Sequence, residues 1–194
     1  PCPGCNHLLN AHPMNYEELC RTVVEVATEA GNYIHSRINN LAPGAVETKS
    51  KHNFVTEVDK ATEALIIERL KPLVAGAGFI AEEGTETHRG EVYNWVIDPL
   101  DGTTNFIHGA PPVAVSIALI ENDKPVVGVV YEVWLKEVFY AWKGSKAYLN
   151  GKEIRVSDAP TVRDSLIATG FPYTKFDRFS QYMETMEYFF NNTH

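Results

Sequence analysis

Two carboxylates three residues apart stand directly after an apolar segment near the middle of the chain. Asp98 follows Trp95-Val96-Ile97, and Asp101 precedes Gly102-Thr103-Thr104. Hard divalent cations prefer carboxylate ligands, and backbone N–H groups at a helix start bind phosphate. Pro99 suits a turn and the first turn of a helix. The segment therefore predicts a strand that ends at Asp98, then a site where a cation and a phosphate group meet.

An ordinary turn between a strand and a helix is the alternative explanation for Asp-Pro-x-Asp-Gly. Taken alone, these five residues favour that turn. The whole string from Trp95 to Phe106 favours the site, because turn chemistry explains neither its apolar start nor its pair of threonines.

Further acidic residues stand in two other segments. Glu82 and Glu83 follow the apolar run Phe79-Ile80-Ala81, so either one of them completes a cation site with Asp98 or both lie in a solvated acidic loop. Asp59 either supplies a favourable charge at a helix start or accepts a hydrogen bond from a catalytic hydroxyl. Lys49, in a polar segment expected to be a loop, is either a surface charge or a neighbour of phosphate.

The elements that must position these residues follow from hydrophobic periodicity. Apolar residues at helical spacing predict one helix from Tyr16 to Ile38 and a second between Thr56 and Pro72. The period then changes to that of strands over 79–81, 95–97, 113–120, 126–131 and 138–142. The pattern predicts an α+β fold in which two N-terminal helices pack on a mostly antiparallel sheet.

The last third of the sequence predicts a hairpin, a strand and a helix. Asn150-Gly151 is a strong hairpin signal between strands expected over 147–149 and 154–156. One more strand is expected over 165–169. A final helix is expected over about 179–190, with Tyr182, Met183 and Met186 on its inner side.

Composition narrows the classes of function. The chain has 194 residues, is 44% hydrophobic and carries a net charge of −8, which argues against direct contact with nucleic acid. Bound cations would reverse the local field and let an acidic protein bind phosphate. Neither a membrane segment nor a leader is expected, and three cysteines fit a reducing cytoplasm. Residues 1–13 include a CxxC spacing and are expected to be a non-native or disordered extension before Met14.

The motifs together resemble those of the inositol monophosphatase family. The strings are WVIDPLDGTTNF, FVTEVD and FIAEEG, followed by IATGFP, and the resemblance runs from about Met14 to the end. It implies a layered α/β sandwich of the sugar-phosphatase type. It also implies Mg²⁺-dependent hydrolysis of inositol monophosphate, or a similar small polyol phosphate, through a metal-activated water.

The resemblance assigns metal ligands by position. Glu82, Asp98 and the carbonyl of Leu100 would hold the first Mg²⁺, and Asp98 with Asp101 would hold the second. Asp98 would bridge the two ions, as in other two-metal sites.

The resemblance also assigns catalytic and substrate-binding roles. Backbone amides of Gly102 and Thr103 would bind the phosphate, with Asp101 and Lys49 as further substrate contacts. The Thr103 hydroxyl, oriented by Asp59, would help to position and deprotonate the water, so that the catalytic set is Asp59, Glu82 and Thr103.

One departure from the family pattern affects what is expected of this chain. The family has a Trp-Asp pair downstream that completes the second metal site, and none of Trp95, Trp134 and Trp142 is followed by Asp. Residues 14–194 are therefore expected to be the N-terminal part of the domain, without its C-terminal α/β half. Weak binding of the second metal, severely reduced or absent activity and an exposed packing surface are expected.

Other functions remain open at this point. Within the superfamily, the substrate could be a sugar bisphosphate or a nucleotide bisphosphate. A different class is a protein-binding regulator of transcription with a residual phosphatase site, which the intact acidic residues Glu82 and Asp98 disfavour. A homodimer is expected by analogy with the family.

Overall fold

Two apolar stripes with helical spacing form the N-terminal helices of the protein. The computed structural model describes residues 14–38, 40, 46–50, 53–84, 86–170 and 176–193, and for 46–50 and 53–56 the backbone alone. α1 (Tyr16–Arg37) begins after Asn15, whose side chain accepts a hydrogen bond from the N–H of Glu18, as a good N-cap does. α2 is Glu57–Leu70. Both helices agree closely with the prediction.

Most strands are joined by short turns, so neighbours in sequence are neighbours in the sheet. Within the described residues, eight strands form one sheet in the order β10-β9-β8-β7-β6-β5-β3-β4, and all neighbours are antiparallel except β3 with β5. This confirms the predicted α+β class with a mostly antiparallel sheet. The strands are β3 (Gly78–Ala81), β4 (Thr87–His88), β5 (Tyr93–Asp101), β6 (Ala114–Glu121), β7 (Lys124–Glu132), β8 (Glu137–Trp142), β9 (Ala147–Leu149) and β10 (Lys152–Ile154).

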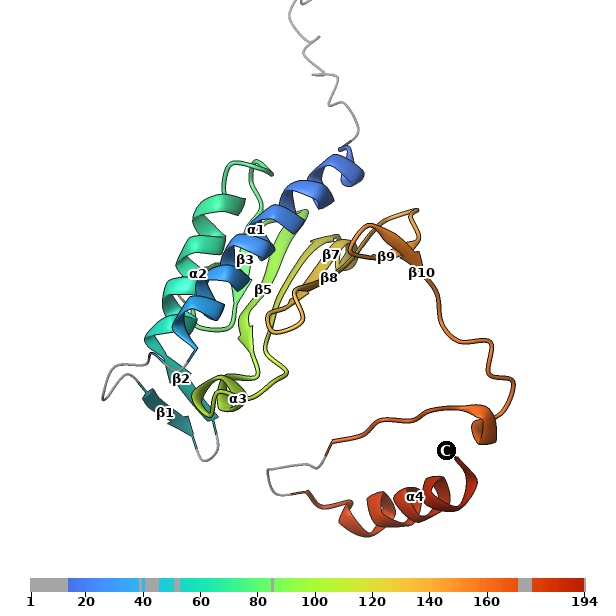
Figure 1. The fold of residues 1–194 in the computed structure, drawn as a ribbon. Coiled ribbons are helices and arrows are strands. Elements are labelled where there is room, and N and C mark those ends of the chain that lie inside the picture. The colour runs from blue at the N-terminus through green and yellow to red at the C-terminus, as the bar shows by residue number, and fades with distance from the viewer. Residues whose placement is uncertain are drawn as a thin grey trace, which may run out of the picture.

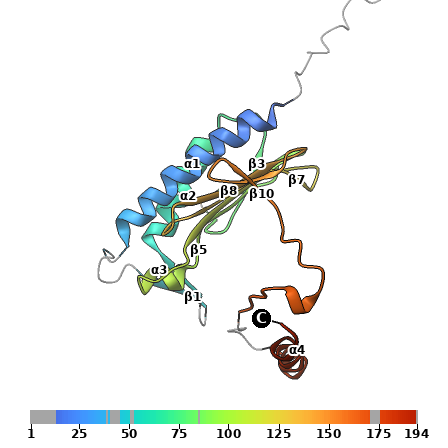
Figure 2. The same cartoon turned by 45° about the vertical axis from the view of Figure 1, so that its right-hand side comes forward.

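Helices α1 and α2 lie side by side on one face of this sheet (Figures 1 and 2). α1 packs on β6, β7 and β8, and α2 packs on β5, with Trp95 fully buried between the layers. α1 approaches the sheet so closely at Gly31 that a Cβ there would clash with the ring of Tyr131. Because side chains alternate along a strand, the opposite face carries the exposed apolar residues Val96, Val130 and Phe139.

A small hairpin and a short helix lie at the end of the sheet where β5 finishes. β1 (Val46–Ser50) pairs antiparallel with β2 (Asn53–Thr56), and β2 contacts both α2 and α3 (Thr103–Ile107). Sequence patterns did not predict this hairpin. The expectation that Lys49 lies in a loop is wrong, because its backbone belongs to β1. Its side chain lies outside the described part, as do residues 1–13.

The β9–β10 hairpin corrects one predicted boundary. Asn150 and Gly151 have φ values of 48° and 84°, which form a two-residue turn. The second strand therefore resumes at once, at Lys152, and ends at Ile154 rather than spanning 154–156.

The C-terminal segment leaves the sheet after β10 (Figure 1). A 3-10 turn at Val162–Asp164 and α4 (Phe179–Asn192) flank an extended stretch over 165–170. The predicted strand over 165–169 is wrong for the described residues, because the stretch pairs with none of them. An isolated extended segment gains no ladder hydrogen bonds. The predicted helix over 179–190 is confirmed.

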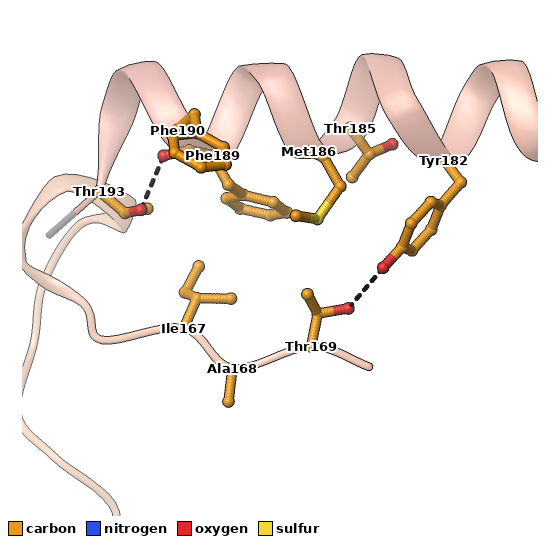
Figure 3. A pocket seen from close by; sticks show the side chains of 9 residues that line it. All are labelled: Ile167, Ala168, Thr169, Tyr182, Thr185, Met186, Phe189, Phe190 and Thr193. Atoms are coloured by element: carbon orange, nitrogen blue, oxygen red, sulfur yellow. Dashed lines mark hydrogen bonds between the residues drawn. The ribbon is translucent and has the colours of Figure 1, made fainter. Parts of the chain in front are cut away.

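Helix α4 packs on this extended stretch rather than on the sheet. Figure 3 shows Tyr182 and Met186 facing Ile167 and Thr169 across a cavity of about 380 Å³. The Tyr182 hydroxyl donates to the carbonyl of Gly170 at 2.9 Å. Met183, predicted on the inner side, is 45% exposed, so that part of the prediction is wrong. None of the helices described is long and apolar enough to cross a membrane.

Candidate active site

Strand β5 positions the aspartate pair through a bulge. Asp98 opposes Ser116 and Asp101 opposes Ala114, so three steps along β5 match two along β6. Proline has no N–H to donate, so the interruption tolerates Pro99. The expectation that Pro99 begins a helix is wrong: β5 continues to Asp101, and α3 begins at Thr103. As a result, Asp98 is half-buried and Asp101 is exposed.

Glu82 reaches Asp98 because β3 and β5 are parallel neighbours. Ala81 pairs with Ile97, so the residues that follow the paired positions, Glu82 and Asp98, lie side by side. The N–H of Glu82 donates to the carbonyl of Ile97 at 3.2 Å, which continues the ladder by one residue. The structure therefore brings together the two carboxylates that the sequence predicted to meet.

The charge at this strand end is concentrated enough to perturb Asp98. Burial raises its pKa to about 7, and the charges of Glu82 and Asp101 and a hydrogen bond with Glu82 act in the same direction. The N–H of Leu100, 3.2 Å from Oδ1 of Asp98, acts the other way. A carboxylate held among like charges favours either a proton or a cation.

Asp59 and Thr103 form the second part of the site. The Thr103 hydroxyl lies 3.1 Å from Oδ1 of Asp59 and 3.2 Å from the carbonyl of Leu100, so its single proton can be donated to either oxygen. Asp59 is only 1% exposed, at the N-terminus of α2. The predicted pairing of Asp59 with a hydroxyl is thus present, and Thr103 is the hydroxyl.

Gly102 makes the tight turn between β5 and α3. Its φ is 92°, and a Cβ would lie 2.7 Å from the carbonyl of Pro112. Both facts favour glycine at this position. The amides of Gly102 and Thr103 stand at the start of α3, where a helix has N–H groups without partners inside the helix.

Sequence reasoning missed one buried acid, Glu63 of α2. It is fully buried, and its Oε2 accepts a hydrogen bond of 2.7 Å from the N–H of Glu83. Its position four residues after Asp59, on the same helix face, is the signal that could have identified it.

The oxygen donors at this site fit a hard divalent cation by their chemistry. Glu82, Asp98 and Asp101 offer carboxylates, and Leu100 offers a carbonyl. In the described part of the chain, no group of three or more His, Cys, Asp or Glu side chains is drawn together tightly enough to hold a metal ion. Burial, and then the charges of Glu82 and Asp101, raise the pKa of Asp98, and a bound cation would neutralise these charges.

Known structures share this arrangement of helices and sheet. The extragenic suppressor protein suhB from Bartonella henselae superposes with a TM-score of 0.81 at 33% identity, covering 91% of this chain and 68% of that one. The IMPase of Thermotoga maritima gives a TM-score of 0.74 at 28% identity, covering 92% and 67%. The protein thus has the inositol monophosphatase fold.

Sequence comparison identifies the family itself. The sequence model of the inositol monophosphatase family matches residues 15–194, and the chain belongs to this family. It is 44% identical over 158 residues to Inositol monophosphatase 2 of Solanum lycopersicum, covering 79% of this chain and 59% of that protein. It is 39% identical over 183 residues to Nus factor SuhB of Escherichia coli strain K12, covering 93% and 66%. The chain therefore spans about three fifths to two thirds of these curated relatives.

Proposed function

We propose that the protein is a Mg²⁺-dependent phosphomonoesterase acting on inositol monophosphate or a similar small polyol phosphate. The observation that carries this proposal is the meeting of Asp98 with Glu82 beside the hydrogen-bonded pair of Asp59 and Thr103. Membership of the inositol monophosphatase family and the name of the tomato relative support the choice of substrate.

The proposal assigns the cation ligands to the strand ends. Glu82, Asp98 and the carbonyl of Leu100 would hold one Mg²⁺, and Asp98 with Asp101 a second. When bound, Mg²⁺ supplies Lewis acidity and positive charge at the phosphate ester. Asp101 is exposed while Asp98 is half-buried, so among the described ligands the second position is the weaker one.

The remaining residues position the phosphate and move a proton. The amides of Gly102 and Thr103 would donate to phosphate oxygens, an arrangement that helix starts favour. When the Thr103 hydroxyl donates to Asp59, its oxygen lone pairs can accept a hydrogen bond from a water molecule. A water molecule that donates to Thr103 can then pass a proton through this hydroxyl to Asp59 as its oxygen attacks phosphorus. The P–O bond to the polyol breaks as the new bond forms, and the leaving oxygen takes a proton from solvent. Lys49 is proposed as a further phosphate contact.

A second candidate function is protein binding in transcription. The Escherichia coli relative is named a Nus factor, and its likeness covers 93% of this chain. A protein-binding function would not require an intact cation site. The net charge of −8 disfavours direct contact with RNA and favours a basic protein partner.

The cellular setting and assembly state complete the proposal. We place the protein in the cytoplasm, where the free thiol of buried Cys20 would stay reduced. A homodimer is proposed by analogy with the family. Sedimentation of the purified chain as a monomer would contradict the dimer.

Phosphate release from inositol 1-phosphate, measured against Mg²⁺ concentration, tests the enzymatic proposal. Asp98→Asn removes the shared ligand, and Asp123→Asn in the exposed β6–β7 turn is the matched control. We expect at most slow release from the parent chain and the control, and none from Asp98→Asn. Release that persists in Asp98→Asn would refute the metal assignment. Absence of release from all three, with one Mg²⁺ bound, would indicate an incomplete second metal site and would not by itself favour the protein-binding function.

A further inference from the structure

Glu63 is a buried carboxyl group that the proposed mechanism does not use. It lies in the middle of α2 with no exposed surface, a position where an acidic side chain is rare. Burying a carboxyl costs free energy that only good hydrogen bonds offset. Its Oε2 accepts a 2.7 Å hydrogen bond from the N–H of Glu83, in the loop after β3.

This hydrogen bond fixes the backbone on one side of Glu82. The N–H of Glu83 belongs to the peptide group that follows Glu82, and Glu63 holds it. The peptide group that precedes Glu82 is also held, because its N–H donates to the carbonyl of Ile97 at 3.2 Å. With both flanking peptide groups anchored, the direction in which the Glu82 side chain leaves the backbone is set.

The same helix also holds the other half of the site. Asp59 precedes Glu63 by four residues, so the two acids lie one turn apart on one face of α2. Asp59 accepts from the Thr103 hydroxyl at the β5–α3 turn, and Glu63 accepts from the loop after β3. α2 therefore ties together two loops that belong to different strands.

We propose that Glu63 is a positioning residue that aims Glu82 at Asp98 and, with Asp59, makes α2 the frame of the active site. It acts through the Glu83 amide and contacts neither cation nor substrate. This inference rests on the proposed function in one respect: Glu82 must be a cation ligand. The anchoring of the loop stands on the hydrogen bonds alone.

Hydrogen exchange at the Glu83 amide tests the anchoring directly. Glu63→Met removes the acceptor at similar volume, and Glu63→Asp keeps a carboxylate too short to reach. We expect exchange at this amide to be about tenfold faster or more in both, while amides of β6 are unchanged. Glu63→Gln keeps an oxygen of the same reach and should exchange at nearly the parent rate. If Glu63→Met does not fold, the comparison of Glu63→Asp with Glu63→Gln tests the anchoring of the Glu83 amide.

Binding of Mn²⁺, followed by its paramagnetic resonance, tests the consequence for Glu82. Replacing a residue that orients a metal ligand typically weakens binding about tenfold or more, and we expect this for Glu63→Met and Glu63→Asp but not Glu63→Gln. The proposal would be overturned if exchange at the Glu83 amide were unchanged in Glu63→Met and Glu63→Asp, or if exchange rose equally throughout the sheet. Unchanged Mn²⁺ affinity in these two variants would also overturn it. If the parent chain binds no Mn²⁺, the proposed function fails, and the exchange rates still decide the anchoring.

Discussion

Replacing Asp98 with Asn should stabilise the protein when no divalent cation is present. The pKa of Asp98 is raised from 3.8 to about 7 in the folded state by burial and by its acidic neighbours. At 1.36 kcal/mol for each pH unit, that difference corresponds to at most about 4 kcal/mol. Because Asp98 is only half-buried and solvent screens its charge, we expect a gain of about 2 kcal/mol.

The sign of this effect depends on pH in a defined way. A carboxyl whose pKa is raised on folding binds a proton more tightly in the folded state, so the parent protein loses stability as pH rises from about 4 to about 7. The advantage of Asp98→Asn should therefore be complete at about pH 8.5, less than half as large at about pH 5 and absent below about pH 4.

Urea unfolding in the presence of EDTA measures this difference. Asp123→Asn, in an exposed turn, controls for the loss of one negative charge. Addition of Mg²⁺ at about one hundred times its dissociation constant should stabilise the parent by about 2.7 kcal/mol and leave Asp98→Asn unchanged. The reasoning is refuted if Asp98→Asn is no more stable than the parent at about pH 8.5 without cations.

Four shorter predictions follow from other contacts. Thr103→Val, which removes one hydrogen-bond donor from the buried Asp59, should lower the free energy of unfolding by about 1–3 kcal/mol and abolish phosphate release, whereas Thr103→Ser should keep the stability and activity of the parent, as unfolding and activity assays would show. Mg²⁺ affinity, measured by calorimetry, should fall about tenfold for each pH unit below about 7, because a proton on Asp98 competes with the cation. Gly31→Ala should cost about 1–3 kcal/mol in urea unfolding, and the double variant with Tyr131→Leu should recover much of it, because the clash is with that ring. Burial raises the pKa of the Cys20 thiol to about 11, so its alkylation at neutral pH should be slow in the folded protein and fast after unfolding, as mass spectrometry would show.

The sequence predicted the core of the site because strong local signals determine it. Apolar runs that end in acids placed Glu82 and Asp98 at strand ends, and their pairing in parallel strands brought them together. Only the family resemblance identified Thr103 as the hydroxyl that pairs with Asp59, since the two residues are 44 positions apart and carry no local signal of contact.

The errors lie where tertiary contacts override local preference. Proline usually ends a strand, but at Pro99 a bulge against β6 lets β5 continue. The hairpin of β1 and β2 is too polar to show an apolar alternation. Glu63 was missed because its spacing from Asp59 shows only that the two acids share a helix face, whereas its burial and its contact with the Glu83 amide appear only in the structure.

The order of strands in the sheet has a consequence for how the protein folds. From β5 to β10 every strand pairs with the next in the chain, so these hairpins close short loops and should form early. α1, by contrast, must dock on β7, about a hundred residues away in sequence. Asp98 and Thr103 lie in or next to the early-forming strands, whereas Asp59 and Glu63 lie on α2 and take their positions only when the helices dock. The protein should thus form the β5–β10 part of its sheet before it possesses an active site, and refolding followed by fluorescence and by cation binding should show two separate phases.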